Sequence, residues 1–73
     1  MKVTRKDNHD SLWLKLTIDK ETYVKLTINR RGVNVKFKGA VPGLANEVVR
    51  RFKALDESLS YGEMLDQLEK SFK

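Results

Sequence analysis

The amino-acid sequence predicts an α+β fold, in which a three-stranded antiparallel β-meander is followed by two α-helices packed on its apolar face (βββαα). Two observations carry this prediction. From residue 11 to residue 38, apolar and polar residues alternate with a period of two, as in strands that bury one face. After the breaker segment KGAVPG, apolar residues recur every three or four positions, which is the period of an α-helix.

The chain divides into two expected parts. Residues 1–10 are polar and lack a clear period, so we expect them to form a flexible arm. Residues 11–73 are expected to form a single small domain, because a chain of 73 residues supports only one thin core. No internal repeat or low-complexity segment interrupts this second part.

Three alternating runs define the expected strands: SLWLKLTI, TYVKLTIN and VNVKFK. The turn NRRG places Gly32 where a hairpin loop needs a left-handed residue. The pairing that keeps the apolar residues together then sets Lys25 opposite Lys36. The turn DKE lacks glycine and leaves two registers open, with Lys15 either opposite Lys25 or on a diagonal to it. The strand residues expected in the core are Leu12, Leu14, Leu16, Ile18, Val24, Leu26, Ile28, Val33, Val35 and Phe37.

Two helices are expected after Pro42. The second begins cleanly, because Ser60 is a suitable N-cap and Glu63 follows three residues later as in a capping box. The apolar stripe of the first helix contains Leu44, Val48, Phe52 and Leu55, flanked by Ala45 and Val49. The stripe of the second contains Tyr61, Met64, Leu65, Leu68 and Phe72.

The polar positions of the strands form the expected binding face. They include four lysines and two aromatic residues but no acid. Lysines neutralise phosphates, and exposed aromatic residues stack on bases or anchor protein interfaces. A structural interpretation stays open beside this one, because lysines on open sheets also prevent aggregation. The candidate residues for binding a partner or nucleic acid are Trp13, Lys15, Tyr23, Lys25, Arg30, Arg31, Asn34, Lys36 and Lys38.

The charge is distributed unevenly. The net charge is +5, and residues 1–40 carry ten Lys or Arg against four Asp or Glu. Such a surface attracts nucleic acid, an anionic membrane or an acidic protein patch. The absence of cysteine excludes disulfides and thiolate metal sites and favours a reducing compartment. We expect a cytoplasmic protein, in the host cytoplasm if a phage encodes it, and no membrane partner, since no apolar run could span a bilayer.

Catalytic chemistry has little support in the sequence. His9 is the only histidine and lies in the expected arm, where DNHD is more simply a solvated tail than a metal site. Ser60 is explained by helix capping. No phosphate-binding loop is present. We therefore expect a non-enzymatic protein with no catalytic residue, metal, cofactor or small-molecule substrate.

The second half of the chain combines the strand VNVKFK, Pro42 before a helix, RRFKAL within it, and LSYGEMLDQLEKSF as a turn and second helix. Together these pieces, over residues 33–72, resemble the ribbon-helix-helix family of DNA-binding proteins. The resemblance implies a dimer whose paired strands enter the major groove, with Asn34, Lys36 and Lys38 contacting bases or phosphates. The chain departs from the family pattern in the strands expected before the ribbon.

In length and character, the chain is also similar to the small regulators that phages encode to take over their hosts, in particular inhibitors and antiterminators of the host RNA polymerase. That similarity implies a protein partner rather than a DNA sequence. We therefore rank three hypotheses: a transcription regulator that binds RNA polymerase through the basic face and the arm, a direct DNA- or RNA-binding protein, and an antitoxin- or immunity-type inhibitor. A monomer is expected.

Overall fold

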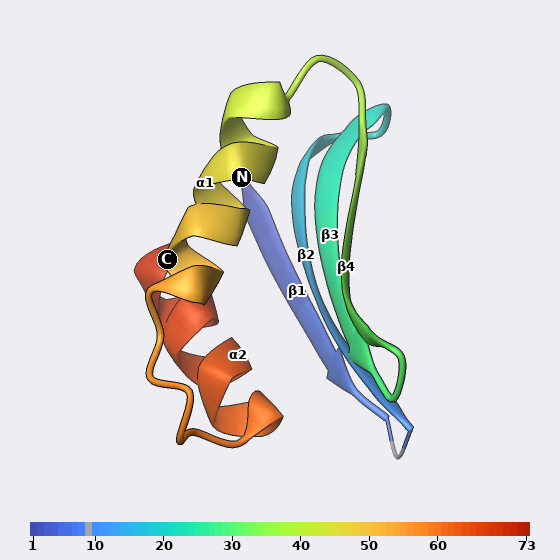
Figure 1. Ribbon diagram of the computed structural model, residues 1–73. Helices are drawn as coiled ribbons and strands as arrows, with labels where there is room; N and C mark the ends of the chain where they lie inside the picture. Colours follow the sequence, from blue (N-terminus) through green and yellow to red (C-terminus); the bar gives the residue numbers. More distant parts are fainter. Residues whose placement is uncertain (9) are drawn as a thin grey trace.

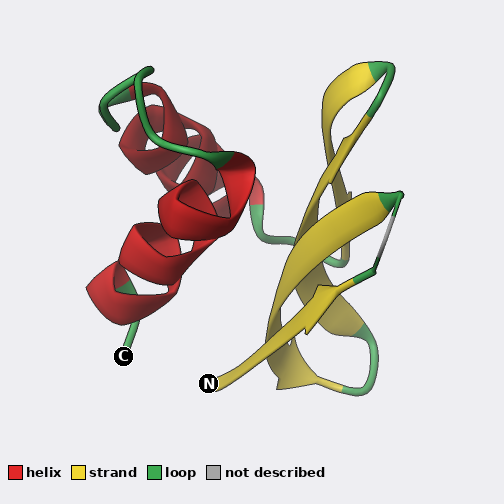
Figure 2. Cartoon of the chain, turned by 90° about the horizontal axis from the view of Figure 1, so that it is seen from below, coloured by secondary structure: helices red, strands yellow, loops and turns green. Residues whose placement is uncertain are grey.

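The structure, a computed structural model, describes residues 1–8 and 10–73 and arranges them in two layers. One layer is an antiparallel sheet with strand order β1-β2-β3-β4, and the other consists of two helices on one face of the sheet (Figures 1 and 2). The strands are β1 (Lys2–Asp7), β2 (Ser11–Asp19), β3 (Thr22–Asn29) and β4 (Gly32–Lys38). The helices are α1 (Pro42–Lys53) and α2 (Tyr61–Ser71).

The α+β class and the two terminal helices are confirmed, but the described residues form four strands where the sequence predicted three. The additional strand is Lys2–Asp7, which was expected to be part of a flexible arm. It pairs with β2, so that Val3 lies opposite Leu16 and Arg5 opposite Leu14. Without β1, β2 would leave its backbone donors and acceptors unpaired at the edge of the sheet. His9, which was assigned from the sequence to a solvated tail rather than a metal site, lies outside the described residues.

The strand registers follow the predicted pairing. Lys25 lies opposite Lys36. Of the two registers left open for the first hairpin, the one with Lys15 opposite Lys25 is present. The register shifts between Thr17 and Asp19, so that Ile18 is an extra residue in β2. Gly32 has a φ of 124°, a backbone conformation that favours glycine and explains its place in the β3–β4 turn.

The helices begin where their local sequences indicate. Pro42 is the first residue of α1, a position where its missing N–H has no helical partner to lose. Ser60 caps α2: its Oγ accepts a hydrogen bond from the backbone N–H of Glu63 at 3.2 Å, and Glu63 Oε1 accepts from the backbone N–H of Ser60 at 3.3 Å. The capping box is therefore confirmed.

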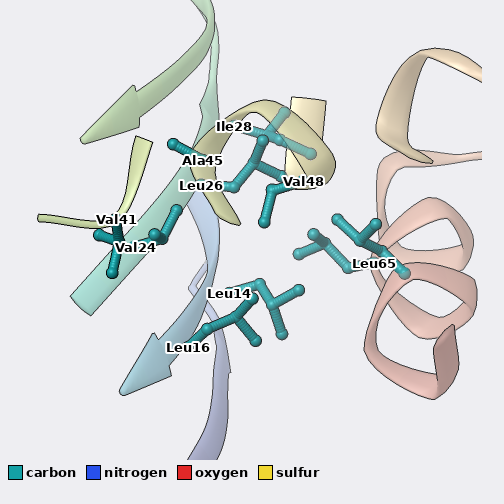
Figure 3. Close-up of a cluster of buried hydrophobic side chains, with 10 residues drawn as sticks. Leu14, Leu16, Val24, Leu26, Ile28, Val41, Ala45, Val48 and Leu65 are labelled. Atoms are coloured by element: carbon teal, nitrogen blue, oxygen red, sulfur yellow. The ribbon is translucent and has the colours of Figure 1, made fainter. Parts of the chain in front are cut away.

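The core lies between the layers, where α1 packs against β3 and β4 and α2 against β1 and β2 (Figure 3). No polar side chain of the described residues is buried in it. Tyr61, predicted for the core as part of the second helical stripe, is 51% exposed, and three strand residues predicted for the core are also largely exposed: Ile18 at 49%, Val33 at 45% and Phe37 at 52%. Ile18 lies in the bulge, whereas the other two lie on β4, at the edge of the sheet. The buried residues are Leu14, Leu16, Val24, Leu26, Ile28, Val41, Ala45, Val48, Met64, Leu65 and Leu68.

Arg5 links β1 to α2 through side-chain contacts. Its side chain is only 16% exposed and forms ion pairs with Asp7, at 2.7 Å, and with Asp66 of α2. It also donates to the carbonyl oxygen of Gly62 at 3.2 Å. The hydrogen bond between Arg5 and Asp7 raises the pKa of the guanidinium and lowers that of the carboxyl. The Arg5 contacts link β1 to α2, whereas the pairing of β1 with β2 determines where its outward side chains lie.

Candidate functional site

The face of the sheet turned away from the helices is the candidate site (Figure 2). Because Leu14, Leu16 and Leu26 are buried under the helices, their neighbours in sequence point outward. The strand registers arrange these outward residues in three rows across the sheet. The rows are Lys2, Thr17, Tyr23 and Lys38; Thr4, Lys15, Lys25 and Lys36; and Lys6, Trp13, Thr27 and Asn34.

We call these twelve positions the outer face. Within them, the described strands present six lysines and two aromatic residues, but no aspartate or glutamate. The acids lie elsewhere: on the helices, in the turns, at the last residue of β2 and at the inward position of Asp7. The positive charge of the protein is therefore concentrated on one side.

Lys15 and Lys25 lie directly opposite each other, an arrangement in which like charges repel. Each lysine instead extends along a diagonal to an aromatic ring. Lys25 Nζ lies 4.7 Å from the centre of the Trp13 ring, and Lys15 Nζ lies 4.5 Å from that of Tyr23. The two ammonium groups therefore point toward opposite ends of the strands, and each contact contributes about 0.5–1 kcal/mol at a partly exposed site.

The middle row, which contains Lys15, Lys25 and Lys36, carries charges that no ion pair within the described residues neutralises. Lys36 is exposed and, like Lys15 and Lys25, forms no ion pair with any residue that the structure describes. Lys38 differs, since its Nζ lies 3.1 Å from Glu21 Oε2. An anionic partner would thus meet cations without first displacing carboxylates from most of the face.

On the helix side, by contrast, arginines of α1 are paired with a carboxylate. Glu47 accepts hydrogen bonds from Arg50, at 2.6 Å, and from Arg51, at 2.7 Å, and these bonds lower the pKa of its carboxyl to about 2. Arg51 also donates to the carbonyl oxygen of Ser71 at 2.6 Å, which links α1 to the end of α2. These cations are already paired, so they add little to an anion-binding surface.

Most of the predicted site residues lie together. Trp13, Lys15, Tyr23, Lys25, Asn34, Lys36 and Lys38 share the outer face. Arg30 and Arg31 do not, because they form the turn between β3 and β4 at one end of it. Arg30 there pairs with Asp10 at 3.3 Å.

The sequence interpretation missed three outer-face residues, all on β1. These are Lys2, Thr4 and Lys6, which extend the face by a full strand. Their alternation in KVTRKD was a signal of a strand, but the charged inward positions Arg5 and Asp7 hid the apolar half of the pattern.

Other types of site have less support in the geometry. No group of three or more potential metal-ligating side chains occurs among residues 1–8 and 10–73. A groove of about 230 Å³ lies between β4 and α1, lined mostly by apolar side chains. Neither helix in the described part of the chain is long and apolar enough to cross a membrane.

The outer face can therefore bind anions in a particular way. Its ammonium groups are available to carboxylates or phosphates, whereas the Trp13 and Tyr23 rings are each covered by a lysine. A nucleic-acid base that stacks on the ring face occupied by the lysine would first have to displace that lysine. Comparisons with protein-family models, with curated proteins and with solved structures found no match to this chain.

Proposed function

We propose that this protein is a small, non-catalytic transcription regulator that binds RNA polymerase through the outer face. The observation that carries the proposal is the concentration of six lysines and two aromatic residues, without an acid, on one exposed face of the described sheet. Such a face fits an acidic protein surface with an apolar component. Binding would take place in the cytoplasm, where the polymerase works.

A protein partner is favoured over nucleic acid by the two cation–π pairs. A carboxylate can approach Lys15 or Lys25 while each ammonium group stays on its ring, because the ring covers only one side of the cation. Base stacking on the same ring faces would require each lysine to leave its ring. RNA polymerase is named as the acidic partner because of the similarity to phage-encoded regulators.

Direct binding of DNA or RNA is the second candidate. The row formed by Lys15, Lys25 and Lys36 supports it, because it crosses three strands at the strand spacing of about 4.8 Å. A phosphate backbone that follows this row could contact all three lysines. Such contacts would release counterions and make binding depend steeply on salt.

The test uses Trp13, the only tryptophan of the chain, as a fluorescent reporter on the outer face. The protein, carrying a fluorescent label, is titrated with purified bacterial RNA polymerase core enzyme, which is free of nucleic acid, and anisotropy of the label on this small protein gives an independent Kd. We expect saturable binding, and a change in Trp13 emission. Absence of binding by both signals would refute RNA polymerase as the partner and leave direct nucleic-acid binding and the antitoxin- or immunity-type inhibitor.

A matched pair of double variants locates the interface. Lys25→Ala with Lys36→Ala removes two charges from the outer face, and Lys70→Ala with Lys73→Ala removes two charges from the last turn of α2 and the residues just after it. We expect the first pair to weaken binding at least about tenfold, which corresponds to about 1.4 kcal/mol, and the second pair to have a much smaller effect. Equal losses would mean that net charge, rather than the outer face, determines binding.

Salt and nuclease separate the two candidates. With a DNA duplex and a single-stranded RNA as probes, the affinity of a nucleic-acid-binding protein should fall steeply with salt, and the Lys25→Ala and Lys36→Ala changes should reduce the logarithmic salt slope by about two. If RNA polymerase is the partner, binding should survive nuclease treatment and weaken less with salt. Nuclease-sensitive capture would favour the second candidate.

A further inference from the structure

The two edges of the sheet are protected very differently. On β1, the inward positions carry Arg5 and Asp7 next to the apolar Val3, and Arg5 is fastened to α2. Inward-pointing charges of this kind discourage another strand from pairing.

On β4, the inward positions are the apolar Val33, Val35 and Phe37. The edge of β4 therefore lacks the charged inward residues that protect β1.

Two of the three inward apolar side chains of β4 are largely exposed. Val33 is 45% exposed and Phe37 is 52% exposed, although both point to the side of the sheet that the helices cover. Within the described chain, no strand pairs with β4 on the side opposite β3. Every second residue of an edge strand directs its backbone N–H and C=O toward solvent. The edge thus offers both a hydrogen-bonding ladder and apolar side chains.

The groove between β4 and α1 continues this apolar surface. It has a volume of about 230 Å³. Its one charged residue is Lys53, at the end of α1. A strand added beside β4 would direct every second side chain toward this layer. The groove is lined by Leu26, Val33, Val35, Val49, Phe52 and Lys53.

We propose that β4 binds an extended segment of a partner protein as a fifth strand, and that acidic and apolar residues alternate in this segment. The apolar residues would lie beside Val33 and Phe37, and the acids would lie on the outer face beside Lys36 and Lys38. Main-chain hydrogen bonds would supply affinity, and the alternating side chains would supply specificity. This site goes beyond the proposed function, since it does not require the partner to be RNA polymerase.

A second copy of the chain fits this edge less well. In an antiparallel pairing of two β4 strands centred on Val35, Lys36 lies opposite Asn34 of the other copy but diagonal to the other Lys36. Each copy also carries a net charge of +5. Repulsion therefore opposes self-association, whereas an acidic strand would be attracted to the same positions.

The probe for this site is a short blocked peptide in which glutamate alternates with valine. NMR spectra of the labelled protein and backbone amide hydrogen exchange would report where it binds. We expect saturable shifts on β4, and exchange slowed at least about tenfold for β4 amides on the free edge but unchanged on β1. Binding without added protection of β4 would contradict strand addition.

Three control peptides separate the forces involved. A peptide that alternates glutamate with serine keeps the charge, one that alternates lysine with valine keeps the apolar residues, and an N-methylated glutamate–valine peptide keeps both but lacks donors along one edge. We expect each control to bind at least about tenfold more weakly. Equal binding of the N-methylated peptide would exclude a hydrogen-bonded strand, and equal binding of the serine peptide would exclude the apolar contact.

A pair of variants tests the apolar residues in the protein. Val33→Ser with Phe37→Ser alters only exposed side chains on β4, so the fold should persist, as circular dichroism would check. Tyr61→Ser, on α2, is the control because Tyr61 is similarly exposed at 51%. We expect only the β4 variant to lose peptide affinity. Loss in both variants, or in neither, would overturn the proposed site.

Two outcomes distinguish this inference from its alternatives. Sedimentation of the protein alone should show a monomer across the concentrations used, and dimerisation accompanied by protection of β4 would replace the proposed partner with a second copy. RNA polymerase binding is measured separately on the unaltered protein. Peptide binding without polymerase binding would refute the proposed function alone, and polymerase binding without peptide binding would refute the fifth strand alone.

Discussion

The two faces of the sheet use the same strands for opposite purposes. On β2, Leu16 is buried under the helices, whereas its neighbours Lys15 and Thr17 lie on the outer face. The inner face gains stability from burial of apolar surface, and the described residues bury no polar side chain there. The outer face presents lysines that the protein leaves largely unneutralised. A change on one face should therefore alter stability, and a change on the other should alter binding.

The largest effect should come from the inner face. Leu16→Ala removes a side chain that is only 1% exposed and leaves a cavity, so we expect the free energy of unfolding to fall by about 2–5 kcal/mol. In Thr17→Ala, the neighbouring change on the outer face, the loss should stay within about 1 kcal/mol and reflect strand propensity alone. Urea unfolding measures both values. Similar losses in the two variants would mean that the faces are assigned incorrectly.

Much of this alternation could be predicted from the sequence. The period of two in β2, β3 and β4 identified the strands, and the Gly32 turn determined which residues of the second hairpin lie opposite each other. The capping box at Ser60 and Glu63 located the start of α2. These signals are local, because each one depends only on residues that are close together in the sequence.

The features that the sequence did not reveal depend on contacts between distant segments. β1 was missed because Arg5 occupies an inward position, which is acceptable only because Asp66 and Gly62 of α2 lie beside it. The exposure of Val33 and Phe37 was missed for a related reason. Alternation identifies the inward face of a strand, but it does not report how far the helices extend over the last strand of the sheet.

The next largest effect should come from the charged position on the inner face. Arg5→Ala removes the link from β1 to Asp66 and Gly62, and we expect the free energy of unfolding to fall by about 1–3 kcal/mol. Hydrogen exchange of β1 amides should become faster than that of β3 amides. Lys6→Ala, the neighbouring outer-face change, should have little effect on either measurement. Unchanged exchange of β1 in Arg5→Ala would show that backbone pairing alone holds this strand.

Acid should also act mainly away from the outer face, because the carboxyls with lowered pKa values lie elsewhere. Glu47 has a folded-state pKa of about 2 against an ordinary value of 4.5, owing to its bonds with Arg50 and Arg51. A carboxyl with a lowered pKa stabilises the folded state above its unfolded-state pKa, and this contribution is lost as pH falls through the folded-state value. We therefore expect stability to decline between about pH 4.5 and about pH 2.

Urea unfolding at a series of pH values measures this decline. Asp7 and Asp56, whose pKa values are also lowered, should contribute in the same direction. In Glu47→Gln the decline should be smaller, because the hydrogen-bonded carboxylate is absent at every pH. Thr27→Ala, on the outer face, should leave the dependence of the unfolding free energy on pH unchanged. A decline of equal size in Glu47→Gln and the parent protein would remove Glu47 from the explanation.

The smallest effect concerns the outer face itself. A double-mutant cycle with Trp13→Ala and Lys25→Ala should give a coupling free energy of about 0.5–1 kcal/mol, because the Lys25 ammonium lies 4.7 Å from the Trp13 ring centre. The same cycle with Trp13 and Lys36, which lie on strands that are not neighbours, should be additive within error. Combining Lys25→Ala with Lys36→Ala should leave the melting temperature nearly unchanged, because lost repulsion offsets the lost ring contact. A clear fall in that temperature would mean that these lysines stabilise the fold, and that their position on the outer face reflects structure rather than binding.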